Sequence, residues 1–260
     1  MDRRTFLLAG AAAIAAAACS GGESASRAGT TTTTTSTTAP PPPAPSATTT
    51  PPPPAPAAFV DTGPRTHDRV ALTFHTNGDL GLAQQLLDTL ASRDAVVTCF
   101  IVGNWLDANP SWAKKLQDAG HELANHTYTH PDFLSLSPDA MRDEVVRCRD
   151  VLTRLTGSPG AFFRPSGTDD GTATPPEIVL EVARDAGYAT VLGFDVDPLD
   201  YQDPGADAVV QRTLATVGPG SIVSMHFGHP GTITAMPAVL DGLQRKGLVP
   251  VTASKLLAPG

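Results

Sequence analysis

Two histidines separated by three residues, His126 and His130, are the strongest chemical signal in this sequence. They follow directly on the apolar run 122–125, and their spacing allows both imidazoles to ligate one metal ion. Imidazole suits zinc and its divalent neighbours, and a bound divalent cation can generate a nucleophile from water at neutral pH. The same spacing also occurs in histidines that are hydrogen-bonded within a protein or exposed at its surface and bind no metal. The surrounding elements must therefore decide whether this pair is a metal site.

Apolar strand-like runs alternate with amphipathic helical segments from residue 63 onward. Continuous apolar strands between such helices predict a parallel sheet covered by helices. We therefore expect an α/β fold, a distorted and shortened (β/α) barrel with about seven parallel strands. The expected strands are 70–74, 96–102, 162–164, 190–196, 221–225 and 248–251, and the expected helices are 83–93, 109–120, 137–157, 174–187, 207–217 and 237–247.

Ionisable side chains lie at the ends of four of the expected strands, and His126 directly follows the apolar run 122–125, which we count as a fifth strand end. In a barrel of this kind the carboxyl ends of the strands meet at one face, where catalytic groups gather. Five strand ends that place such groups on one face are far harder to attribute to chance than one histidine pair. The sequence therefore predicts a catalytic or metal site formed by His75, His126, Arg164, Asp195 with Asp197, and His226.

The ordered blocks around these residues resemble the polysaccharide deacetylases, the carbohydrate esterases of the NodB-homology type. The resemblance covers about residues 65–257. It implies a metal-dependent hydrolase that removes N-acetyl groups from amino sugars of a polymer such as peptidoglycan or chitin. The blocks that carry it are 71–74, 120–131, 163–167, 195–201 and 220–226.

The resemblance also implies roles for individual residues. His126 and His130 would bind one divalent cation, expected to be zinc. His226 would be the acid that protonates the leaving amine, with Asp200 as its partner carboxylate. Arg164 would steady the catalytic carboxylate.

The first block departs from the family, which has two adjacent aspartates where this chain has His75 and Thr76. The Asn77-Gly78 pair is a tight-turn signal that would bring Asp79 back to the barrel mouth. Two assignments follow. Asp79 completes the metal site and His75 is the base, or His75 is the third ligand and Asp79 is the base. The first keeps the family's ligand set and is preferred.

Two further activities stay open beside N-deacetylation. The loss of the aspartate pair is compatible with a catalytically impaired relative that only binds glycans. The scaffold also suits an O-acetyl esterase. Tyr201 and Pro165 are expected to contact the polysaccharide in each case.

The amino terminus predicts export. The pair Arg3-Arg4 precedes an Ala-rich apolar run, which indicates a twin-arginine export signal over 1–18. Cys19 follows at a lipoprotein-like processing site, so we expect a lipid anchor there. Residues 19–62 are rich in Thr and Pro and predict a disordered linker, with the catalytic domain over 63–260. The expected location is the outer face of the cell membrane or the cell wall.

Composition limits the remaining possibilities. The 260 residues are 41% hydrophobic with a formal net charge of −8, which suits one globular domain and a disordered segment. The acidic balance argues against nucleic acid, whose binding needs basic patches. Cys99 and Cys148 lie in apolar runs and are expected to be free thiols. We expect a monomer.

Overall fold

The computed structural model describes residues 55–168 and 170–259. The predicted export signal, Cys19 and most of the predicted linker therefore lie outside the described residues. The linker boundary at residue 62 was placed too far along the chain. Strand β1 (Ala58–Val60) pairs in parallel with β5 (Thr190–Leu192), and Ala57 is buried beside it, so the folded part already includes these residues.

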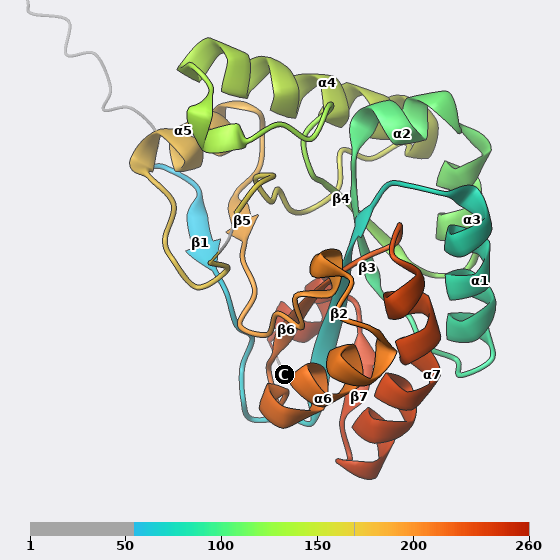
Figure 1. The fold of residues 1–260 in the computed structure, drawn as a ribbon. Coiled ribbons are helices and arrows are strands. Elements are labelled where there is room, and N and C mark those ends of the chain that lie inside the picture. Colours follow the sequence, from blue (N-terminus) through green and yellow to red (C-terminus); the bar gives the residue numbers. More distant parts are fainter. Residues whose placement is uncertain (1–54, 169, 260) are drawn as a thin grey trace, which may run out of the picture. The chain divides into compact units, whose positions relative to one another are not determined.

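Seven parallel strands form the centre of the described fold (Figure 1). β2 is the longest and pairs with β3, β6 and β7, while β4 pairs with β3. Single bridges at Phe163 and Val196 connect β4 to β5 and the segment after β5 to β6. The predicted distorted, shortened barrel is confirmed. The bounds are Arg69–Thr76 (β2), Thr98–Ile101 (β3), Glu122–Asn125 (β4), Ile222–His226 (β6) and Val249–Val251 (β7).

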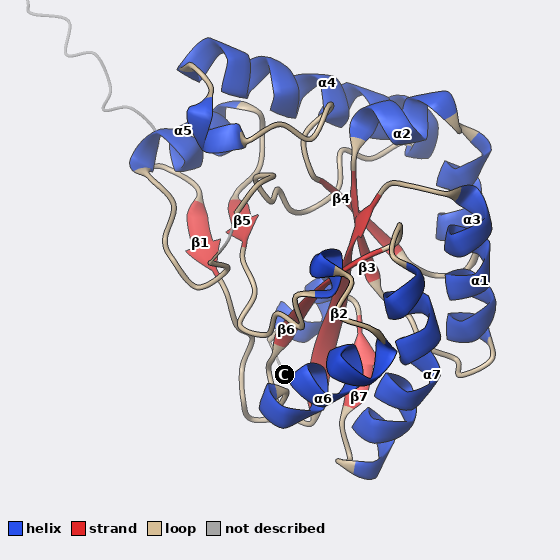
Figure 2. Ribbon diagram, in the orientation of Figure 1, coloured by secondary structure: helices blue, strands red, loops and turns tan. Residues whose placement is uncertain are grey.

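Helices surround these strands (Figure 2). None of the described helices is both long and apolar enough to cross a membrane. The α-helices are Leu80–Ala91 (α1), Gly103–Ala108 (α2), Ser111–Asp118 (α3), Pro138–Thr156 (α4), Glu177–Asp185 (α5), Ala206–Thr216 (α6), Pro230–Arg245 (α7) and Ala253–Leu257 (α8), with 3-10 turns at Phe133–Ser135 (η1) and Asp200–Gln202 (η2).

Capping residues set both ends of α4. The Ser137 side chain accepts the Ala140 N–H at the start of α4, and Gly157 ends this helix with a left-handed φ of 78°, as cap preferences predict. Several helices differ from expectation. α2 and α8 were not predicted, and α1 begins three residues earlier than expected, at Leu80. α7 begins at Pro230 and continues through Pro237, although proline removes one helical N–H.

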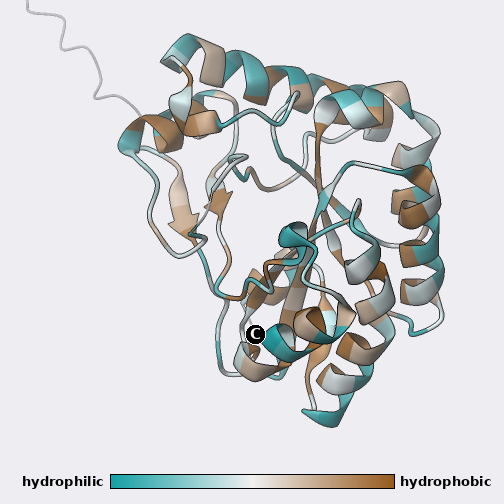
Figure 3. Cartoon of the chain, in the orientation of Figure 1, coloured by the Kyte–Doolittle hydropathy of each residue, from teal (hydrophilic) through white to brown (hydrophobic). Residues whose placement is uncertain are grey.

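Buried apolar side chains fill the space between strands and helices. The helices carry hydrophobic residues on the side facing the strands and polar residues on the other (Figure 3), as amphipathic packing requires. Trp105 and Trp112 are both buried, with ring centroids 5.5 Å apart, so they pack in the core. The two cysteines of the folded part, Cys99 and Cys148, are free and buried as expected, and burial raises the pKa of each thiol to about 12.

Candidate active site

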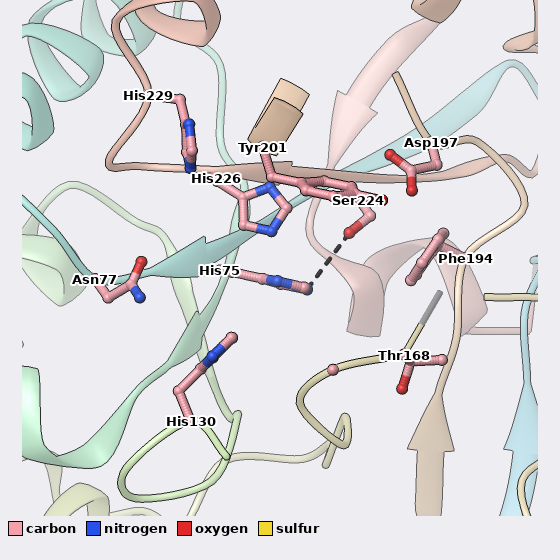
Figure 4. A pocket seen from close by; sticks show the side chains of 11 residues that line it. His75, Asn77, His130, Thr168, Phe194, Asp197, Tyr201, Ser224, His226 and His229 are labelled. Atoms are coloured by element: carbon pink, nitrogen blue, oxygen red, sulfur yellow. Dashed lines mark hydrogen bonds between the residues drawn. The ribbon is translucent and has the colours of Figure 1, made fainter. Parts of the chain in front are cut away.

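Four histidines meet at the carboxyl ends of the central strands. β2 and β6 run side by side with His75 opposite His226, and the centroids of these two rings are 4.4 Å apart. The ring of His126, directly after β4, lies 3.9 Å from that of His75 and 4.9 Å from that of His130. Figure 4 shows His75 between His130 and His226. The structure therefore brings together the histidines that the sequence singled out.

The loop after β4 holds an unusual backbone conformation. Thr127 and His130 have positive φ values of 68° and 61°, which are rare for residues with a β-carbon and rarer for a β-branched one. The buried Glu144 carboxylate fixes the loop by accepting the N–H groups of Tyr128 and Thr129 at 2.9 and 2.7 Å. Strained backbone held by its surroundings is typical of functional sites, and here it turns His130 back toward His126.

His75, His126 and His130 form a possible metal-binding group. One nitrogen from each ring lies within 4.8 Å of the others. Among the described residues, Nδ1 of His75 and Nε2 of His126 are buried and have no hydrogen-bond partner. Buried polar atoms are nearly always paired, so two such atoms in one cluster point to a missing partner. Three imidazoles are a donor set suited to zinc.

The second nitrogen of two of these rings has a protein partner. Nδ1 of His126 donates to the Arg164 carbonyl oxygen at 2.9 Å, which leaves Nε2 with its lone pair free. Nε2 of His75 makes a long contact of 3.4 Å with Ser224 Oγ, which leaves Nδ1 facing the cluster. Such outer contacts fix the tautomer and orientation of metal-ligating histidines.

Burial keeps these imidazoles neutral. It lowers the pKa of His75 and His126 well below 6.5, and it also lowers the pKa of the partly exposed His130. Neighbouring histidines reinforce each effect. Metal ligation needs the unprotonated ring, so the cluster is in its ligating form at neutral pH.

His226 and Asp200 form a tightly held pair on the other side of the pocket. Nδ1 of His226 lies 2.8 Å from Asp200 Oδ1, while Asp200 Oδ2 accepts the His226 backbone N–H at 2.8 Å and the Thr232 hydroxyl at 2.6 Å. Asp200 is only 1% exposed. Leu199, with φ 54°, turns the chain so that this carboxylate reaches His226. The imidazole is therefore oriented as a general acid or base requires.

Both sequence-based assignments required Asp79 to lie at the barrel mouth, and the structure places it at the start of helix α1 instead. Its carboxylate Oδ1 caps helix α1 by accepting the Gly81 and Leu82 N–H groups at 2.8 and 3.0 Å, and its side chain is exposed. It does not belong to the histidine cluster. The preferred assignment, with Asp79 as a ligand, does not fit this placement. Of the two ligand sets considered, the geometry favours the three histidines.

Arg164 is fully buried and, within the part of the chain that the structure describes, donates to no carboxylate, in contrast to its expected role. Its guanidinium donates at 2.8 Å to the carbonyl oxygens of Leu192 and Gly193 and to the Thr73 hydroxyl, and it lies over the Phe100 ring. Burial lowers its pKa to about 9, so it stays protonated at neutral pH. It ties together the ends of strands that position the site.

A cavity of about 240 Å³ opens in front of the histidines. Tyr201, predicted to contact substrate, lines it, whereas Pro165 is buried and is not part of its lining. Sequence reasoning missed Ser224, although residues two apart in a strand share a face and Ser224 precedes His226 by two. The cavity is lined by His75, Asn77, His130, Gly167, Thr168, Phe194, Asp197, Tyr201, Ser224, His226 and His229.

This arrangement defines a class of protein: an α/β-barrel hydrolase with a histidine metal group facing a His–Asp pair. The sequence profile of the polysaccharide deacetylase family matches residues 62–191. A chitooligosaccharide deacetylase from Bradyrhizobium sp. is 31% identical over 192 residues, which cover 68% of this chain and 85% of that protein. The chain therefore belongs to the polysaccharide deacetylase family, and the sequence-based prediction of such a hydrolase is confirmed.

Solved structures agree with this membership. A peptidoglycan N-acetylglucosamine deacetylase superposes with a TM-score of 0.70 at 28% identity, covering 77% of this chain and 93% of that one. A CE4 family pseudoenzyme from Bacillus anthracis also superposes with a TM-score of 0.70, at 27% identity, covering 77% of this chain and 69% of that one. A mutant of that pseudoenzyme is described as having restored enzymatic activity.

Proposed function

We propose that this protein removes N-acetyl groups from amino sugars of a cell-envelope or extracellular polysaccharide, either peptidoglycan or a chitin-like polymer. One observation carries the proposal. The group of His75, His126 and His130, with two unpartnered buried nitrogens, adjoins the pocket that His75, His130 and the Asp200-bound His226 line. A ligand set for a cation and an oriented proton donor are the two parts that amide hydrolysis needs.

His75, His126 and His130 are the residues that would hold one divalent cation. Zinc is the metal we propose, because three neutral imidazoles with an open fourth position match its catalytic sites. Such a cation, when bound, polarises the acetyl carbonyl and lowers the pKa of water.

His226 is proposed to protonate the leaving nitrogen. Asp200 holds its Nδ1, so Nε2 is the ring atom left for the substrate. An amide needs this proton more than an ester does, because an amine anion is the poorer leaving group. The His226–Asp200 pair therefore supports N-deacetylation over O-acetyl ester cleavage.

Tyr201 is proposed to form one wall for the sugar. It is 40% exposed at the mouth of the cavity, with its ring centroid 5.6 Å from that of His226. An aromatic ring with one free face can pack against the apolar face of a sugar.

The test is acetate release from N-acetylated chito-oligosaccharides and from peptidoglycan fragments by zinc-loaded protein. We expect turnover by the wild type, and a loss of at least about 100-fold for His226→Ala with its zinc content unchanged. Arg245→Ala, at the far end of α7, is the matched surface control. Normal turnover by His226→Ala would contradict the proposed role.

A second candidate is a glycan-binding protein with little turnover. It is supported by the likeness to a pseudoenzyme and by the histidine group itself, which no carboxylate of the described residues joins. The same experiment distinguishes the two. Protein that binds zinc and chito-oligosaccharide but releases no acetate would establish the binding role and overturn the hydrolase.

We also propose export and attachment to the outer face of the membrane through a lipid on Cys19. The paired Arg3-Arg4, the apolar run to residue 18 and the Thr/Pro-rich residues 19–62 support this. Cys19→Ala should move the protein from the membrane fraction to the soluble fraction and abolish labelling by a fatty-acid analogue. Replacement of both arginines by lysine should instead prevent export. Unchanged membrane attachment of Cys19→Ala would refute the anchor.

A further inference from the structure

Asp197 is the single carboxylate among the described residues that line the active-site cavity. It lies in the loop that connects β5 to η2, three residues before Asp200. Two other carboxylates of the neighbouring loops accept hydrogen bonds from the backbone. Asp79 caps α1, and Asp195 accepts the Ile222 N–H at 2.7 Å and the Ser221 hydroxyl at 3.1 Å. Figure 4 shows the Asp197 carboxylate directed toward the side of the cavity that holds Ser224 and His226.

The Asp197 side chain is held from one oxygen only. Oδ1 accepts the Leu199 N–H at 2.7 Å, in an Asx turn that stabilises the left-handed Leu199 backbone. Oδ2 has no hydrogen-bond partner within the described part of the chain. The turn therefore fixes the carboxylate while one oxygen stays available at the cavity.

Charged groups on three elements surround Asp197. These groups are Asp200 on η2, His226 at the end of β6, and Arg164, which follows the bridge residue Phe163. Partial burial raises the pKa of Asp197 above its ordinary value, and repulsion by Asp200 adds to this, while Arg164 and His226 oppose it. A carboxylate whose pKa moves upward is a better proton acceptor.

We propose that Asp197 is the general base of the deacetylation, in place of the carboxylate that the end of β2 lacks. This inference rests on the proposed function. Asp197 and His226 then divide the proton transfers, with the base on the β5–η2 loop and the acid on β6. Arg164 stabilises the Asp197 carboxylate through space.

The proton transfers balance as follows. The oxygen of water forms a bond to the acetyl carbonyl carbon, and the proton it loses passes to Asp197 Oδ2. The carbon–nitrogen bond then breaks, its electron pair stays on nitrogen, and His226 Nε2 donates the proton that completes the amine. The products are acetate and the free amino sugar. Asp197 releases its proton to solvent, and His226 regains one.

The experiment compares zinc-loaded wild type with Asp197→Asn and Asp197→Ala on N-acetylated chito-oligosaccharide. Asn can still accept the Leu199 N–H, so it removes the base while keeping the turn. We expect kcat to fall about 100-fold to 10 000-fold, with KM and zinc content within about two-fold of wild type. We expect formate to restore part of the kcat of Asp197→Ala, because a small carboxylate fits the space left. Asp207→Asn, exposed in the first turn of α6, is the matched control.

These measurements distinguish a failure of Asp197 as the base from a failure of the proposed deacetylase activity. An active wild type with an Asp197→Asn variant within five-fold of it would overturn Asp197 as the base and leave the deacetylase standing. A zinc-loaded wild type without turnover on chito-oligosaccharide and peptidoglycan would overturn both. Loss of zinc by Asp197→Asn would assign Asp197 a structural role, as would failure of formate to restore Asp197→Ala.

Discussion

The rings of His75 and His126 lie 3.9 Å apart between centroids, and each has one buried nitrogen without a hydrogen-bond partner among the described residues. A shared cation would stabilise two imidazoles held this close in neutral form. This relationship supports the proposal that His75 is a metal ligand in a chain whose β2 end has no aspartate. Thr76 stands where the family has the second aspartate, but its hydroxyl donates to the Phe74 carbonyl at 3.1 Å and is not available to a metal.

His75→Ala should therefore weaken zinc binding strongly. Removal of one of three ligands leaves His126 and His130 alone, and we expect the dissociation constant to rise at least about 100-fold, since even outer-shell partners are worth 10-fold to 100-fold. Competition with a chromophoric chelator measures this directly. Wild-type affinity in His75→Ala would show that the cation binds elsewhere.

Asp79→Ala should change stability but not zinc binding. The carboxylate accepts two N–H groups at the start of α1, and loss of such a cap costs about 1 kcal/mol. Urea unfolding should show this loss in the metal-free protein, while zinc stoichiometry and affinity stay at wild-type values. Asp79→Ser, which retains an N-cap oxygen, should recover most of the stability. A drop in zinc affinity would restore Asp79 as a ligand.

The misplacement of Asp79 in the sequence-based assignment has a specific cause. Helix α1 was expected from residue 83 but begins at Leu80. With the later start, Asp79 falls in a free turn that can fold back to the barrel mouth. With the true start it is the N-cap residue, and its carboxylate is directed at the helix. Helix boundaries are the least certain part of such predictions. Here an error of three residues at the start of α1 made the N-cap residue Asp79 look like a metal ligand.

Elements with strong local signals were predicted well. The apolar β2 and β6 runs, the His126–His130 spacing and the Asp200–His226 partnership needed only strand periodicity and motif order. The contact between Ser224 and His75 needed the register of β2 against β6, which places Thr73 opposite Ser224. That register is a tertiary property, because neither strand encodes it alone. Asp197 likewise gained importance only when no other described residue that lines the cavity proved to be a carboxylate.

The metal-free protein should lose stability as the solution becomes acidic. Burial lowers the pKa of His75 and His126 well below 6.5 in the folded state, whereas the unfolded chain titrates near that value. The unfolded state therefore binds more protons, and folding stability falls as pH decreases below about 6.5. Urea midpoints with chelator present should decrease from pH 7 to pH 5. His75→Gln should show a shallower decrease, and an equal slope in both proteins would refute the explanation.

Ser224→Ala should weaken zinc binding by about 10-fold without unfolding the protein, because Ser224 Oγ is the contact that orients Nε2 of His75. Ser221 is the matched control. It lies three residues earlier, directly before β6, is equally buried, and donates to Asp195 rather than to a histidine. Ser221→Ala should keep wild-type zinc affinity, and Ser224→Thr, which retains a hydroxyl, should recover part of the loss. If both alanine variants bind zinc like the wild type, the orientation of His75 comes from packing against His126 and His226, and the hydroxyl contributes nothing to the site.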